Sequence, residues 1–89
     1  MSFGAKVRQY RKRSDMKQYT LAERVGLTRS HLVEIEGDVV GPPKEKTIVR
    51  IIEELHLSQE EADDLIKEAF YTKAGVLRSR IEATLANSR

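Results

Sequence analysis

The side chains of this chain with the clearest chemical potential are a guanidinium, a hydroxyl and a carboxylate within one short segment: Arg29, Ser30 and Glu34. An arginine can donate two hydrogen bonds to O6 and N7 of guanine, a serine can donate or accept one, and a glutamate can accept one from the amino group of cytosine. Arg29 can equally hold a phosphate, and Glu34 can simply orient Arg29 from one helical turn away. These side chains read bases only if a helix presents them to a DNA groove, so the flanking elements decide their role.

The stretch from Gln18 to Ile35 has the spacing of two short helices joined by a tight turn. Ala22 is small where the second helix would cross the first, and Gly26 suits a left-handed turn in which a β-carbon would be strained. We expect one helix over Lys17–Val25 and another over Arg29–Glu36. The apolar seam that the two share is expected to contain Leu21, Val25, Leu27, Leu32 and Ile35.

With its flanks, this stretch resembles the Xre/Cro type of helix-turn-helix domain, the lambda-repressor-like family, over roughly residues 3–70. The likeness includes Gln18 at the start of a helix, the Leu21-Ala22 pair, the turn Gly26-Leu27-Thr28-Arg29-Ser30 and the ending Ile35-Glu36-Gly37. It implies an all-α fold: a compact five-helix lambda-repressor-like DNA-binding domain with an additional C-terminal helix. Residues 1–71 would form the DNA-binding domain, and residues 72–89 a helical extension for packing or dimerisation.

The resemblance also assigns roles at the start of the two motif helices. It places Gln18 against the DNA backbone, where the helix N-terminus favours a phosphate. Lys17 departs from the serine or threonine common before that glutamine, which makes the usual side-chain cap doubtful. Arg11 and Glu36 correspond to a family pair that joins the first helix to the end of the third, and we assign this pair a structural role.

The remaining predicted contacts lie on or beside the second motif helix, the recognition helix. Thr28 can cap this helix through its hydroxyl. His31 can approach DNA, although a half-exposed histidine without a role is the commoner outcome, and Val33 contacts either a thymine methyl group or the core. Flanking cations are expected to neutralise phosphates. The predicted DNA-binding residues are Lys17, Gln18, Thr28, Arg29, Ser30, His31, Val33, Glu34, Lys44, Lys46 and Arg50.

Composition is consistent with one small binding module. The 89 residues allow a single core but little room for an enclosed active site. The chain contains no cysteine, and its two histidines, His31 and His56, are far apart in sequence, so we expect neither disulfides nor a bound metal or cofactor. No segment has the length of a membrane span or of a signal-peptide core, and a soluble cytoplasmic protein is expected.

The formal net charge is only +2, but the cations are unevenly distributed. Residues 1–57 contain 11 basic and 8 acidic residues, so the positive excess lies in this part of the chain. A polyanion can dock there, while a solvated helix face is the alternative. Five cations precede the first acidic residue: Lys6, Arg8, Arg11, Lys12 and Arg13.

Three further helices are predicted around the motif. Apolar spacing indicates a first helix from Phe3 to about Ser14, with its cations largely away from the apolar stripe. After a loop over Asp38–Lys44, helical periodicity resumes with Ile48, Ile51, Ile52 and Leu55. Ser58-Gln59-Glu60-Glu61 is a capping box for a fifth helix, with Leu57 and Ala62 placed as its hydrophobic staple. Its buried stripe is expected to comprise Leu65, Ile66, Ala69 and Phe70.

The segment from Thr72 to Arg89 places Val76, Leu77, Ile81 and Leu85 on a possible sixth helix. This stripe either packs onto its own core or packs against a second copy.

The resemblance implies a sequence-specific DNA-binding transcriptional regulator, more often a repressor, that binds a twofold operator as a homodimer. The alternative is a protein-interaction module or antitoxin-like protein that holds a partner through its C-terminal helices. We expect no enzymatic activity, because the adjacent acids Glu60-Glu61 and Asp63-Asp64 look like solvated side chains and no nucleophile-base set accompanies them.

Overall fold

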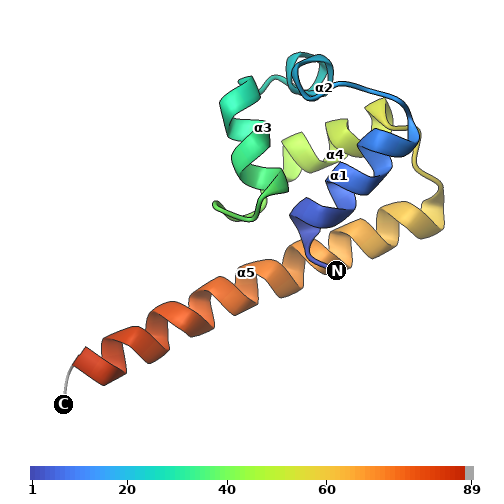
Figure 1. Ribbon diagram of the computed structural model, residues 1–89. Coiled ribbons are helices and arrows are strands. Elements are labelled where there is room, and N and C mark those ends of the chain that lie inside the picture. Colours follow the sequence, from blue (N-terminus) through green and yellow to red (C-terminus); the bar gives the residue numbers. More distant parts are fainter. Residues whose placement is uncertain (88–89) are drawn as a thin grey trace.

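The computed structural model describes the backbone of residues 1–87 and the side chains of residues 1–71, 78 and 80–87. This part of the chain consists of helices α1 (Phe3–Arg13), α2 (Gln18–Val25), α3 (Arg29–Glu36), α4 (Glu45–Glu54) and α5 (Gln59–Asn87). Figure 1 shows α1 to α4 and the start of α5 gathered into a head, from which the rest of α5 protrudes. The predicted all-α, DNA-binding fold is confirmed.

Side-chain caps start three of these helices: Ser2 caps α1, Thr28 caps α3 and Ser58 caps α5. The Ser2 hydroxyl accepts a hydrogen bond from the Ala5 amide at the start of α1. At the start of α5, the Glu61 amide donates to the Ser58 hydroxyl and the Ser58 amide donates to the Glu61 carboxylate, so the predicted capping box is confirmed. Lys17 forms no side-chain cap on α2, as its departure from serine or threonine indicated.

The core joins the motif helices to α1, α4 and α5. Of the predicted seam, four residues are at most 3% exposed and Leu27 packs against them while partly buried. Ala22 is 1% exposed, in accord with the expected close helix crossing. The largest side chains that are almost fully buried are Phe3, Val7, Leu21, Leu32, Ile35, Ile51 and Leu65.

The N-terminus of α1 is fixed by Asp38, which lies two residues after the end of α3. Asp38 accepts hydrogen bonds from the Ser2 hydroxyl and from the Gly4 amide, the latter at 3.2 Å. A β-carbon on Gly4 would lie 2.1 Å from the carbonyl oxygen of Ile35, so the helix ends can approach this closely only with glycine here. Nothing in the local sequence pattern indicated this contact.

Two expectations for the C-terminal region are wrong. The predicted fifth and sixth helices form one continuous helix, α5, so position 72 is not a helix boundary. Ile66 and Phe70 were expected to be buried but are 52% and 69% exposed, because only the Leu65 and Ala69 side of α5 faces the head. The side chains of Val76 and Leu77 and all of residues 88–89 lie outside the described part. Within that part, no helix combines the length and the apolar character needed to cross a membrane.

Candidate nucleic-acid interface

The outer face of α3 carries the predicted base-reading side chains. Leu32 and Ile35 are at most 1% exposed and anchor the helix in the core, so its opposite face is turned to solvent. Val33 is 43% exposed and therefore belongs to the outer face, not the core. The exposed residues of this face are Arg29, Ser30, His31, Val33 and Glu34.

The turn that precedes α3 sets the direction of this face. Gly26 adopts a left-handed conformation, with φ of 78°, which ends α2 and redirects the chain. Two residues later the hydroxyl of Thr28 accepts a hydrogen bond of 3.1 Å from the amide of His31. The structure therefore uses Thr28 as a helix cap, and its hydroxyl lies at the same N-terminal end as Arg29.

A buried network locks α3 against α1 and α2. Arg11 donates from Nε to Glu36 Oε2 at 2.7 Å and from its Nη2 atom to Glu36 Oε1 at 3.0 Å, while its Nη1 atom donates to the carbonyl of Met16 at 2.8 Å. Gln18 donates to Glu36 Oε1 at 3.1 Å. The predicted pairing of Arg11 with Glu36 is thus present, and it also orients Gln18. This bond engages one N–H of the Gln18 side-chain amide inside the protein and leaves its second N–H and its carbonyl oxygen for other partners.

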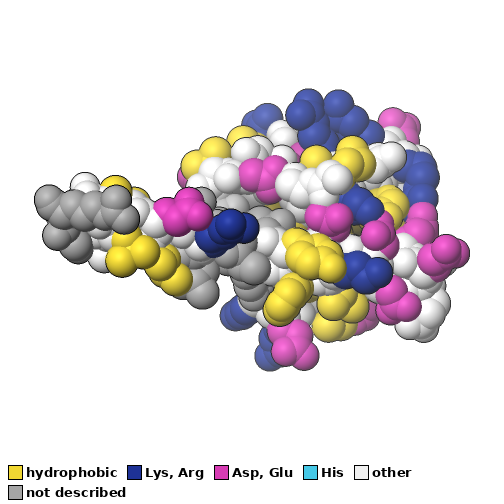
Figure 2. Space-filling model, turned by 90° about the horizontal axis from the view of Figure 1, so that it is seen from below, with side chains coloured by type: hydrophobic (Ala, Val, Ile, Leu, Met, Phe, Trp, Pro, Cys, Tyr) yellow, Lys and Arg dark blue, Asp and Glu magenta, His cyan; other side chains and the backbone are white. Residues whose placement is uncertain are grey.

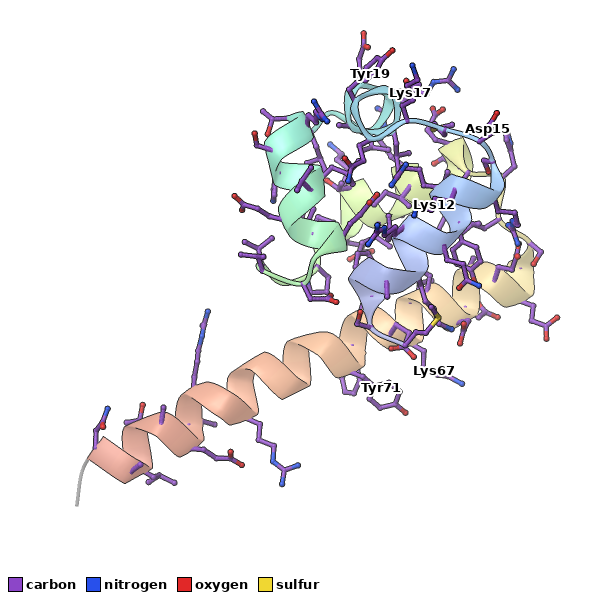
Figure 3. The ribbon with its side chains drawn as sticks, in the orientation of Figure 1. Lys12, Asp15, Lys17, Tyr19, Lys67 and Tyr71 are labelled. Atoms are coloured by element: carbon purple, nitrogen blue, oxygen red, sulfur yellow. The ribbon has the colours of Figure 1, made fainter. Side chains whose placement is uncertain are left out.

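The start of α2 and the start of α3 border one surface hollow. Its lining residues include Lys17, Gln18 and Arg29 together with Arg11 and Tyr19, so residues predicted from two separate helices meet here. The ammonium of Lys17 lies 5.9 Å from the centre of the Tyr19 ring, and Figure 3 shows both side chains at the outer end of α2. Arg11 is nearly buried, and the exposed cations of the hollow are Lys17 and Arg29. An anion such as a phosphate fits this arrangement.

Sequence reasoning missed Tyr19. It is 54% exposed on the rim of the same hollow, next to two predicted contact residues. The available signal was an aromatic residue directly after Gln18 at a position outside the apolar stripe of α2.

The predicted DNA contacts on and beside α4, namely Lys44, Lys46 and Arg50, are not among the residues that line this hollow. Lys44, the residue before α4, and Lys46 in its first turn are exposed. Arg50 instead donates a hydrogen bond of 2.8 Å to the carbonyl oxygen of Arg24. Because Arg24 is in the last turn of α2, this contact ties α4 to the end of α2 that is remote from Gln18.

Three of the five N-terminal cations are engaged inside the domain. Besides the pairing of Arg11, Lys6 forms an ion pair with Asp64 and Arg13 with Glu61. The expectation that the cations lie largely away from the apolar stripe is therefore wrong for Arg11 and Lys6, whose side chains are only 9% and 15% exposed. Glu61 and Asp64, expected to be solvated acids, instead tie α5 to α1. The exposed cations left on this helix are Arg8 and Lys12.

The ion pair between Arg13 and Glu61 shifts the pKa values of both side chains. The hydrogen bond from Arg13, and next the one from the Ser58 amide, lower the pKa of Glu61 from 4.5 to about 2. The same hydrogen bond raises the pKa of Arg13. Both groups are therefore charged at neutral pH, and their ion pair links α1 to α5. Among the described residues, no group of three His, Cys, Asp or Glu side chains is arranged to hold a metal ion.

Comparison with known proteins yields one match. A family model described as a helix-turn-helix domain matches residues 2–65, which include α1 to α4 and the first turns of α5. No curated protein and no solved structure gives a significant match.

Proposed function

This chain belongs to the helix-turn-helix domain family, and from that premise we propose that it is a sequence-specific transcriptional regulator of the Xre/Cro type that binds double-stranded DNA. In such motifs the second helix lies in the major groove, with its N-terminal side chains at the base edges, while the first crosses the sugar-phosphate backbone. Here these helices are α3 and α2. The proposed location is the cytoplasm, and no catalytic step is assigned to the protein.

One observation carries this proposal: the solvent-facing side of α3 continues into the hollow at the start of α2. Arg29 belongs to both surfaces, since it is exposed on α3 and lines the hollow beside Lys17 and Gln18. A phosphate in the hollow would fix the depth of α3 in the groove, and the outer face of α3 would then read the bases. Because Leu32 and Ile35 hold α3 in the core, this face is presented without a prior ordering step.

The proposed division of labour follows from the chemistry of each side chain. Arg29 and Ser30 are assigned to base edges, Val33 to a thymine methyl group, and Glu34 to a cytosine amino group or to orienting Arg29. His31 is placed at the groove wall. The backbone contacts are assigned to Lys17, Gln18, Thr28, Lys44 and Lys46, while Arg50 joins them only if it leaves the carbonyl of Arg24.

We assign the protein the role of a repressor that binds a twofold operator as a homodimer. A bound dimer covers two half-sites about one DNA turn apart and so excludes other proteins from that stretch of promoter. Direction of regulation depends on where the operator lies, so the assignment is tested by locating the site.

The first experiment is selection of binders from a randomised duplex pool with the purified full chain, followed by sequencing. Enrichment of a palindrome supports a dimeric operator reader, whereas enrichment of one isolated half-site retains base reading but contradicts the dimer. Affinity for the selected duplex and for a scrambled duplex is then measured against salt concentration. Equal weak binding to both, with no enriched sequence, overturns the proposal.

A second candidate function is a protein-interaction module or antitoxin-like protein. The observation in its favour is the set of exposed apolar side chains on α5, which DNA reading does not require: Ile66, Phe70, Tyr71, Ile81 and Leu85. This candidate predicts no sequence enrichment from the duplex pool.

A further inference from the structure

Exposed apolar side chains are aligned along one side of α5. Ile66, Phe70, Ile81 and Leu85 are each between 51% and 69% exposed. At 100° per residue, these four positions fall within a sector of about 100°, so they form one stripe along the helix axis. Figure 2 shows hydrophobic side chains at the surface both of the head and of the protruding helix. The stripe therefore begins on the head and continues onto the part of α5 that the head does not cover.

The head half of the stripe borders an apolar groove between α4 and α5. The groove encloses about 380 Å³ and is lined on one side by Ile66, Ala69 and Phe70 of α5 and on the other by Ile48, Val49 and Ile52 of α4. Its one charged lining residue is Glu45, in the first turn of α4. An occupant of matching chemistry is apolar and carries a positive charge at its edge.

The protruding half of the stripe has this chemistry. Ile81 and Leu85 line a shallow apolar patch together with Thr84 and one cation, Arg80. The neighbouring Arg78 is paired with Glu82 at 3.2 Å, whereas Arg80 is exposed beside the apolar patch. The groove and the patch are therefore complementary both in apolar character and in the sign of their single charges.

The patch cannot reach the groove of its own chain. Because α5 is one continuous helix, Ile81 lies about 16 Å along the axis beyond Phe70. Folding back, one of the two alternatives that the sequence left open, would require a break that α5 does not contain. A second copy meets no such obstacle.

We propose that two copies of this chain pair through antiparallel α5 helices, and that the patch of each copy fills the groove of the other. Placing the twofold axis between residues 75 and 76 sets Ile66 opposite Leu85 of the second copy and Phe70 opposite its Ile81. The twofold axis is perpendicular to both helices, so the side of α5 that faces along this axis in one copy faces the same way in the other. Arg80 projects on the side of α5 that α4 occupies. In the pair it therefore lies next to Glu45, at the start of α4 of the second copy.

The biological meaning of this pairing rests on the proposed function. The separation that the pairing gives the two heads is close to the separation of two DNA half-sites. Leu65, the residue of α5 most deeply buried in the head, would lie about 31 Å along the helix axis from its counterpart. Half-sites read by paired helix-turn-helix domains are about 34 Å apart. The extension over residues 72–87 thus becomes the spacer between two reading heads.

The first test is the oligomeric state of the full chain without DNA, measured by sedimentation equilibrium. The wild type is expected to be a dimer, and Ile81→Glu to weaken the dimer by about tenfold or more, because a carboxylate would enter the apolar groove. Ala83→Glu adds the same charge on the opposite side of α5 and is expected to remain dimeric. A monomeric wild type, or equal weakening by both variants, overturns the proposal.

The second test concerns the register. The chain has no cysteine, so single-cysteine variants report only the introduced thiols. A mixture of Phe70→Cys and Ile81→Cys is expected to give a disulfide-linked heterodimer on mild oxidation, while each variant alone gives little. Efficient crosslinking of Phe70→Cys with itself indicates a parallel pair and overturns the antiparallel register.

A charge exchange completes the test. Glu45→Arg and Arg80→Glu are each expected to weaken the dimer, and the double variant to restore it, because the exchanged charges again face each other. Absence of restoration contradicts the proposed contact. None of these measurements involves DNA, so their failure leaves the duplex selection intact, and failure of that selection leaves the dimer intact.

Discussion

Arg11 and Glu36 form a bidentate ion pair that joins the last turn of α1 to the last residue of α3, with hydrogen bonds of 2.7 and 3.0 Å. The two residues are only 7% and 6% exposed, and the third donor of Arg11 is satisfied by the Met16 carbonyl. Gln18 adds a further hydrogen bond to the same carboxylate. A single buried acid therefore holds the three elements that position the candidate interface.

Removing one partner of this pair is expected to unfold the domain, not merely to reduce DNA affinity. Arg11→Ala or Glu36→Ala would leave a buried charge without its partner, at a cost of about 3–5 kcal/mol in the free energy of unfolding. Urea denaturation measures this loss. Arg8→Ala, which removes an exposed arginine from the same helix, is the control and is expected to change stability by less than about 0.5 kcal/mol. Similar stability in all three variants would contradict the structural role.

Three glycines are expected to respond differently to alanine. Gly26→Ala meets no atom within 4 Å, so its cost of about 1–2 kcal/mol arises from the positive φ alone. Gly4→Ala would collide with the Ile35 carbonyl and is expected to cost about 3 kcal/mol or more. Gly41→Ala, with open space and no positive φ, is the control. Thermal denaturation of the three variants gives the order, and a Gly4→Ala variant as stable as the control would refute the close approach of α1 and α3.

Exposed residues of the candidate interface are expected to affect binding without affecting folding. Arg29→Ala should lower affinity for the selected duplex by about 1–3 kcal/mol and relax the preference at one base pair. Lys44→Ala should weaken binding to all duplexes alike and reduce the slope of log affinity against log salt by nearly one. Lys67→Ala is the matched control, since Figure 3 shows Lys67 on α5 at the side of the head away from Lys17 and Tyr19. Equal salt slopes for Lys44→Ala and the wild type would remove Lys44 from the interface.

Acid is expected to loosen the packing of α1 on α5. The folded pKa of Glu61, about 2, lies below its ordinary value of 4.5, so the stabilisation by Arg13 is complete above about pH 4.5 and is lost as the pH falls towards 2. The unfolding temperature measured across this range should therefore fall less steeply in Glu61→Gln than in the wild type. Glu60→Gln, its exposed neighbour, should keep the wild-type profile. Because the pair lies at the surface, added salt is expected to reduce the difference.

The sequence alone was sufficient for the helices of the motif and for the outer face of α3. The helices of the motif, the cap of α3 at Thr28, the capping box of α5 at Ser58 and the turn at Gly26 depend on interactions within a few residues, which local patterns record. The face of α3 also follows from periodicity, because burying Leu32 and Ile35 leaves Arg29, Ser30 and Glu34 outside.

Apart from the pair of Arg11 with Glu36, which the family resemblance indicated, only the tertiary structure decided which polar groups of distant segments meet. Lys6 and Arg13 find acids on α5, Arg50 finds a carbonyl on α2, and Asp38 reaches the start of α1, across sequence separations that no local pattern encodes. Burial of α5 was likewise misjudged, because an apolar residue such as Phe70 has the same helical spacing whether a neighbour covers it or not. Periodicity fixes the face on which a side chain lies, whereas contact with that face depends on how the other helices pack in space.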